Sequence, residues 1–152
     1  MGVFRKTRIG FAAAALACVG LVGISSPAEA IVLPKSRSVT VYGPDQVVTC
    51  KLTVNGWNAT YQRLNVNLAA SSKPRSFSGY FNNKVTYVGC YAIGLNNPDS
   101  FAAGEAQANG PTASFNKRHF VEYASAFQVC AYGATIKSNG TTTQTPFGCN
   151  PA

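Results

Sequence analysis

Acidic residues and histidine are scarce in this chain of 152 residues, which contains five Asp and Glu residues and one histidine, His119. There is no C-x-x-C pair, and His119 is the only histidine, so the sequence lacks the ligand spacing typical of zinc sites and we expect no metal and no cofactor. The sequence also lacks a G-x-S-x-G motif and paired carboxylates at a defined spacing. It therefore offers few of the groups that catalysis requires.

Residues 1–30 have the pattern of a cleavable secretory signal peptide. Three cations precede the run Ile9–Ile24, which contains no charged residue, and Ala28–Ala30 supplies the small residues that a signal peptidase needs. The apolar run of about 16 residues is shorter than the roughly 20 that cross a bilayer, so we predict no transmembrane segment. We expect cleavage after Ala30 and a secreted, extracellular protein, and the Ala- and Gly-rich signal is typical of bacteria.

Removal of this signal would leave residues 31–152 as a single secreted β domain. Four of the five cysteines remain, and an even number in an exported chain predicts two disulfides. Ten cations and four anions also remain, a net charge of +6, which favours anionic surroundings such as acidic glycans or proteins. The cations stand singly in the sequence, so we expect no dedicated nucleic-acid site.

The pattern of apolar residues predicts an all-β fold. Val39–Tyr42 is predicted as a first strand, Gly43–Asp45 as a turn, and the alternation from Gln46 onward places Cys50 on the inner face of a second strand. Seven to eight short strands separated by regular turn residues favour a two-sheet antiparallel sandwich with an immunoglobulin-like architecture. A barrel is the alternative.

Four dipeptides at similar spacing predict successive hairpin turns. They are Asn55-Gly56, Asn82-Asn83, Asn109-Gly110 and Asn139-Gly140. After the first of these turns, residues 57–68 are predicted to return as a strand, whereas the polar stretch 69–76 is predicted to be a loop. Segment 98–108 stays open between a strand and a short helix, because Asn97-Pro98 resembles a helix start.

The last predicted turn indicates how the cysteines pair. In a hairpin with a two-residue loop at Asn139-Gly140, Cys130 lies directly opposite Cys149. Opposed Cα atoms are roughly 4.5–5.5 Å apart, within the range of a disulfide. We therefore predict Cys130–Cys149 and, by elimination, Cys50–Cys90, which would join two sheets or two non-adjacent strands.

His119 is the candidate for acid–base chemistry because it alone titrates near neutrality. It lies beside Arg118 and near Glu122, and a small ribonuclease-like hydrolase would use such a set for proton transfer and phosphate binding. No motif supports this set. The alternative is that His119 lies partly exposed at a strand start or in a loop.

Aromatic residues are the main candidates for binding. Trp57 could stack on a sugar ring or enter a pocket of a partner protein, and Tyr87 and Tyr91 share one side of their predicted strand. The alternative is that these rings fill the core. The candidate binding residues are Trp57, Tyr61, Lys73 and Arg75.

These observations favour a non-enzymatic secreted binding module, with a glycan, a cell wall or a protein such as a protease as its extracellular partner. A small cationic hydrolase centred on His119 is one alternative, and a structural surface protein is another. We expect a monomer.

Overall fold

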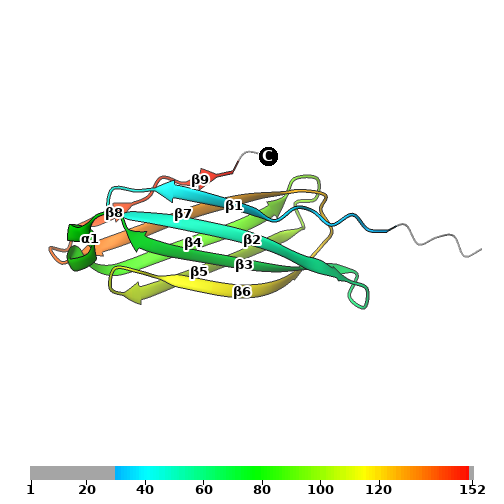
Figure 1. The fold of residues 1–152 in the computed structure, drawn as a ribbon, viewed down its shortest axis with the longest axis horizontal. Coiled ribbons are helices and arrows are strands. Elements are labelled where there is room, and N and C mark those ends of the chain that lie inside the picture. The colour runs from blue at the N-terminus through cyan, green and yellow to red at the C-terminus, as the bar shows by residue number, and fades with distance from the viewer. Residues whose placement is uncertain (1–29, 151–152) are drawn as a thin grey trace, which may run out of the picture. The chain divides into compact units, whose positions relative to one another are not determined.

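The computed structural model describes residues 30–150, and its helix and strands lie between Arg37 and Cys149 (Figure 1). The predicted signal peptide lies outside the described residues, apart from Ala30. Within residues 30–150, no helix is long and apolar enough to cross a membrane.

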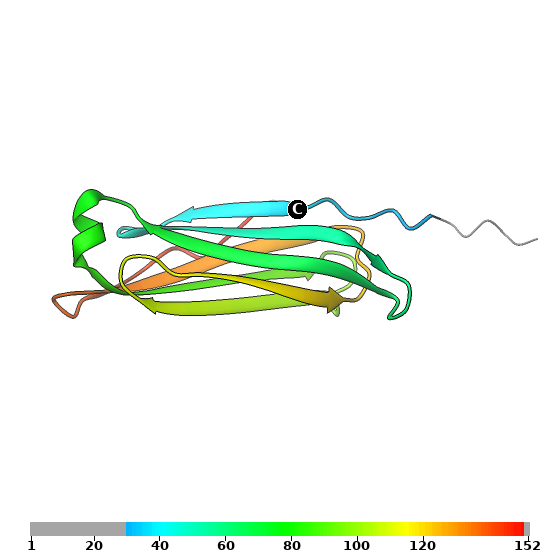
Figure 2. The ribbon, with the colours of Figure 1, turned by 60° about the horizontal axis from the view of Figure 1, so that its bottom comes forward.

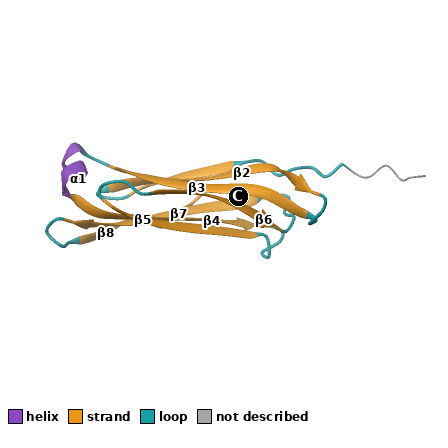
Figure 3. Ribbon diagram, turned by 90° about the horizontal axis from the view of Figure 1, so that it is seen from below, coloured by secondary structure: helices purple, strands orange, loops and turns teal. Residues whose placement is uncertain are grey.

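Two antiparallel sheets lie face to face, as the sequence predicts (Figures 2 and 3). Sheet A has the order β1-β2-β3-β6, formed by Arg37–Tyr42, Gln46–Asn58, Arg63–Pro74 and Ser114–Val121. Sheet B has the order β5-β4-β7-β8, formed by Phe101–Asn109, Asn83–Gly94, Phe127–Lys137 and Thr142–Gln144. A further strand, β9 (Gly148–Cys149), also pairs with β7, so residues 30–150 contain nine strands rather than the predicted seven to eight.

The core lies between the inner faces of the two sheets. The predicted alternation is confirmed in β2, where Val48, Cys50 and Leu52 are fully buried while Lys51 is exposed. Residues of β3, β4 and β7 fill the same layer, among them Leu64, Val66, Leu68, Val88 and Val129. Burial of such side chains, at about 1.5–3 kcal/mol each, is what fixes one face of every strand inward.

Both predicted disulfides are present. Cys50 of β2 is bonded to Cys90 of β4, with Cα atoms 5.5 Å apart, so this bond ties the two sheets together through the core. Cys130 of β7 is bonded to Cys149 of β9, with Cα atoms 4.0 Å apart, and the two residues are directly opposed in the sheet.

The hairpin between β7 and β8, from which the second disulfide was predicted, has a longer loop and a different register than expected. The N–H of Lys137 donates to the carbonyl of Thr141, and Gly140 has a φ of 82°, so three residues rather than two form the loop. The strands beyond it pair one position away from the predicted register, with Thr135 opposite Thr143. One extra residue between β8 and β9 restores the predicted register at the two cysteines.

The predicted turn at Asn55-Gly56 is wrong. β2 continues to Asn58, and its register with β3 shifts between Val54 and Gly56, where Gly56 has a φ of 154°. The Asn-Gly dipeptide therefore forms a β-bulge, and the chain turns at residues 59–62 instead. Two other dipeptides, Asn82-Asn83 and Asn109-Gly110, lie where the chain passes between the sheets and do not form hairpins.

The structure decides two further segments, of which the first was left open between a strand and a helix and the second was predicted to be a loop. From Phe101 onward segment 98–108 belongs to the strand β5 and not to a helix, because Ala102 and Gly104 face the core in alternation with exposed neighbours. The loop predicted for residues 69–76 is wrong for residues 69–74, which belong to β3, and only residues 75–76 connect this strand to the helix that follows. The one helix among residues 30–150 is α1 (Phe77–Asn82), which begins after Ser76, whose Oγ accepts a hydrogen bond from the N–H of Gly79 at 3.1 Å.

Candidate functional site

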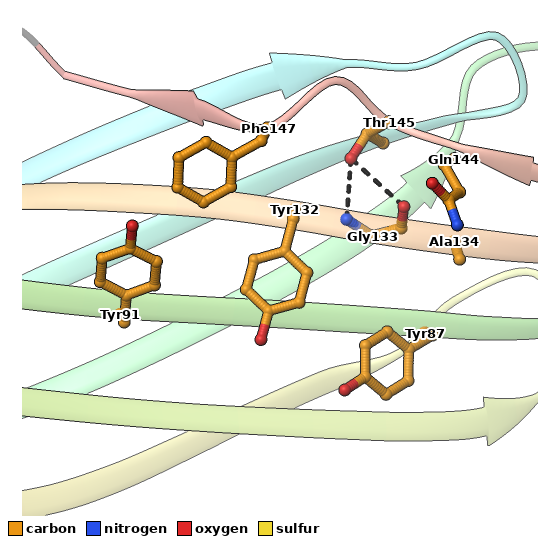
Figure 4. Close-up of a pocket in the computed structure, with 8 residues that line it drawn as sticks. All are labelled: Tyr87, Tyr91, Tyr132, Gly133, Ala134, Gln144, Thr145 and Phe147. Atoms are coloured by element: carbon orange, nitrogen blue, oxygen red, sulfur yellow. Dashed lines mark hydrogen bonds between the residues drawn. The ribbon is translucent and has the colours of Figure 1, made fainter.

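Five aromatic side chains gather on the outer face of sheet B, and we call this set the ring face. They come from β4, β5, β7 and the segment between β8 and β9, and are Tyr87, Tyr91, Phe101, Tyr132 and Phe147. Figure 4 shows four of these rings standing side by side over the strands. Phe101 and Phe147 are 50% and 57% exposed, so the ring face is open to solvent rather than covered by another element.

The rings form one connected row. The centroid of Tyr132 lies 6.4 Å from those of both Tyr87 and Phe147, and the ring of Tyr91 lies 5.7 Å from Phe147 and 6.0 Å from Phe101. All four distances are within the range of attractive aromatic pairs. The row therefore runs across β4, β5, β7 and the segment between β8 and β9, and its rings pack on one another with no other element of residues 30–150 covering them.

Gly89 makes room for the centre of the row. A Cβ atom at this position would lie 2.1 Å from the ring of Tyr132, so any side chain there would push the ring away from β4. Gly89 lies opposite Tyr132 in the ladder between β4 and β7, halfway between Tyr87 and Tyr91. The ring of Tyr132 consequently covers the backbone of β4 and fills the gap between the two tyrosines of that strand.

A single carboxylate, Glu105 of β5, lies among the hydroxyl groups of the ring face. The hydroxyl of Tyr132 donates to Glu105 Oε1 at 2.5 Å. Hydrogen bonds from the hydroxyls of Tyr132 and Tyr87 lower the pKa of Glu105, whereas burial and the bond to Glu105 raise the pKa of Tyr132. At neutral pH the face thus presents an ionised acceptor held by two neutral phenols.

A shallow depression of 640 Å³ lies beside Tyr132 and Phe147, with Gln144 and Thr145 on its border. Its border is rigid. The N–H of Gly133 donates to Thr145 Oγ1 at 2.7 Å, and that hydroxyl donates to the carbonyl of Gly133 at 3.3 Å (Figure 4). The N–H of Thr145 also donates to the carbonyl of Gly133, at 2.9 Å. Just beyond it, the Cys130–Cys149 bond holds β9 against β7. The ring face is therefore presented in one fixed arrangement.

The four binding residues predicted from the sequence lie outside the ring face. Trp57 is partly buried against the core and meets the ring of Tyr123 edge-on at 6.3 Å, which agrees with the core alternative. Tyr61 is 65% exposed in the turn between β2 and β3. Lys73 lies near the end of β3, and Arg75 donates from Nη1 to the carbonyl of Gly43 at 2.9 Å.

Part of the ring face was visible in the sequence. Tyr87 and Tyr91 were expected on one side of a strand, and they do share the outer face of β4. Tyr132 and Phe147 carried no comparable signal. The position of Tyr132 depends on how β7 pairs with β4, and that of Phe147 depends on the extra residue between β8 and β9. A search for a glycine opposite a tyrosine across two predicted strands could have found Tyr132.

The three residues proposed for catalysis do not converge. Arg118 and His119 are consecutive in β6, so their side chains point to opposite faces of sheet A. Glu122 forms an ion pair with Arg63 at 2.9 Å. Burial, and then the charge of Lys117, lower the pKa of His119, so the imidazole is held neutral with no carboxylate contributing to its pKa shift.

The position of His119 predicts how stability depends on pH. Because its folded pKa lies below the ordinary 6.5, the native state favours the neutral form, and stability falls as the pH drops below the unfolded pKa. We expect His119→Gln to reduce the loss of melting temperature between about pH 7.5 and about pH 5. Calorimetry at both pH values measures this difference. An equal loss in both proteins would contradict the assignment, since His119 is the only histidine.

Comparison of the chain with protein-family models, with curated proteins and with solved structures gave no match.

Proposed function

We propose that the domain is a secreted, non-enzymatic binding module that binds a polysaccharide along the ring face. The connected row of five rings carries this proposal, because aromatic faces pack against the C–H groups of sugar rings. The site is a flat, open sheet surface with a shallow depression, and such a surface suits an extended chain better than a small molecule, which proteins usually enclose in a cavity. The two disulfides support a site of action in an oxidising compartment.

The charges of the ring face favour a neutral glycan over an acidic one. Glu105 lies among the phenol groups, where its carboxylate can accept hydrogen bonds from sugar hydroxyls but repels a uronic acid or a phosphate. One cation, Lys117, borders the same area and lies 5.9 Å from the ring centroid of Phe115. The ring face therefore does not share the net positive charge of the chain as a whole.

Retention on insoluble polysaccharides tests the proposal. Residues 31–152 are passed over chitin, cellulose, xylan and purified peptidoglycan, and the amount retained is measured against protein concentration. We expect retention on at least one of them, and we expect Tyr91→Ala/Phe147→Ala to weaken it by at least about tenfold, since each substitution removes an aromatic contact worth about 1 kcal/mol or more.

Tyr61→Ala is the matched control, because Tyr61 is an exposed tyrosine that lies outside the ring face. It should bind as the parent protein does. As a soluble competitor, polygalacturonate, an acidic polymer, should displace the protein from the insoluble polysaccharide less well than a neutral soluble glycan does. Failure of all four polysaccharides to retain the protein, or equal retention by the double variant, would overturn the proposal.

A further inference from the structure

A second aromatic surface lies at one end of the sandwich, on the short helix α1. Gly79 is the one buried residue of this helix. It faces the domain, since a Cβ atom at this position would lie 3.4 Å from both the Pro74 side chain and the carbonyl of Asp45. Because Gly79 faces the domain, the bulky neighbours point outward: Phe77, Tyr80 and Phe81 are 82%, 57% and 67% exposed. We call these three side chains the α1 tip.

The rings of the α1 tip pack on one another. The centroid of Phe81 lies 5.1 Å from that of Phe77 and 5.4 Å from that of Tyr80, both in edge-on geometry. None of the three belongs to the hydrophobic cluster that forms the core within residues 30–150. Large apolar side chains exposed as a group mark a surface that contacts a partner or a membrane.

The sandwich holds this helix firmly. The N–H of Ser138 donates to the carbonyl of Asn82 at 2.8 Å, and Asn83 donates from Nδ2 to the carbonyl of Asp45 at 3.2 Å. Two loops of the same end thus fix the end of α1, and the helix lies at one end of the two sheets, not on one of their faces (Figure 3). The exposure of its rings is therefore a built-in property of the fold.

Only cations accompany the α1 tip in the sequence around it. Lys73, Arg75 and Lys84 flank the helix, and all three are exposed. No acidic residue occurs between Asp45 and Asp99, and the carboxylate of Asp45 is already paired with Lys137 at 2.8 Å. The tip thus combines protruding aromatic rings with a net positive charge.

We propose that the α1 tip is a contact for a membrane surface that contains anionic lipid. Phe77 and Phe81 would enter the boundary between headgroups and acyl chains, where Tyr80 can keep its hydroxyl at headgroup level. The flanking cations would lie at the level of the phosphates, which attract Lys and Arg near a negatively charged surface. A convex, protruding tip can enter a soft lipid interface, whereas a protein partner would need a matching pocket.

Co-sedimentation with vesicles tests this contact. The fragment 31–152 contains every described element and both disulfides, and it is mixed with phosphatidylcholine vesicles with or without phosphatidylglycerol. We expect binding to the phosphatidylglycerol vesicles, reduced at least about tenfold by Phe77→Ala/Phe81→Ala because each buried phenylalanine contributes roughly that factor. We expect Lys73→Gln/Lys84→Gln to weaken binding by about fivefold per cation and added salt to do the same.

Phe101→Ala is the matched control, since it removes an exposed phenylalanine from the ring face and leaves the α1 tip intact. Its vesicle binding should equal that of the parent. No binding to phosphatidylglycerol vesicles, or binding that Phe77→Ala/Phe81→Ala leaves unchanged, would overturn the proposal. Self-association that this double variant abolishes, in a protein that ignores vesicles, would also overturn it and identify a second copy of the chain as the partner.

Discussion

Replacing Cys50 and Cys90 together with alanine is expected to lower the free energy of unfolding by about 4 kcal/mol. The bond closes a loop of 40 residues, and the entropy that it removes from the unfolded chain grows with the length of this loop. Both cysteines are also fully buried between the sheets, so the substitution leaves sulfur-sized gaps in the core. The double substitution avoids a free buried thiol, which a single substitution would create.

The Cys130–Cys149 bond provides the matched comparison. It spans 19 residues and joins neighbouring strands, so its removal by a double alanine substitution should cost less, about 3 kcal/mol. Denaturant titration of the parent and the two double variants measures both losses. A smaller loss for Cys50 and Cys90 than for Cys130 and Cys149 would contradict the view that the bond between the sheets is the main covalent brace.

The inner layer of the sandwich was predictable because it follows from local pattern alone. Alternation in β2 placed Cys50 inward, and this alternation does not depend on which strand pairs with which. The pairing of the cysteines was predicted correctly although the predicted register of the hairpin was one position off. The loop is one residue longer than expected and the bulge after β8 compensates for it, so Cys130 still faces Cys149.

The hairpin turn predicted at Asn55-Gly56 was wrong because the same dipeptide suits two different structures. Gly56 of the Asn-Gly dipeptide adopts a positive φ, which both a hairpin turn and a β-bulge can require. Which of the two forms depends on how β3 pairs with β2, and local sequence does not contain this information. Segment 98–108 stayed open between a strand and a helix for a similar reason, since its alanines suit a helix, yet Ala102 is buried in the core as part of a strand.

The candidate site was harder to predict than the core, because it depends on long-range register. The ring face needs Tyr132 to lie over Gly89, which is 43 positions earlier in the sequence, and Phe147 to reach Tyr91 past a bulge. Trp57 drew attention because it is the one tryptophan, yet its ring packs against the core. The residues that matter for binding are those that the sheet exposes, and exposure follows from the topology.

Substituting two phenylalanines, Phe127 in the core and Phe101 on the ring face, tests whether the core stabilises the fold while the exposed face binds. Phe127 is the largest fully buried side chain among the described residues, at the start of β7, whereas Phe101 is 50% exposed at the start of β5. We expect Phe127→Ala to lower the free energy of unfolding by about 3–5 kcal/mol, because it removes the buried ring and leaves a cavity. Phe101→Ala should change it by less than about 1 kcal/mol.

Polysaccharide binding should be affected more by Phe101→Ala than by Phe127→Ala, the reverse of the order expected for stability. Phe127 points into the core and Phe101 belongs to the ring face, so the folded fraction of Phe127→Ala should bind a retaining polysaccharide as the parent does, while Phe101→Ala should bind it more weakly. Denaturant titration and retention assays on the same preparations measure both quantities. If Phe127→Ala were as stable as the parent, the packing between the sheets would be looser than its complete burial indicates. If both variants lost binding equally, the ring face would depend on the core, and the separation of a stabilising inner layer from a binding outer layer would fail.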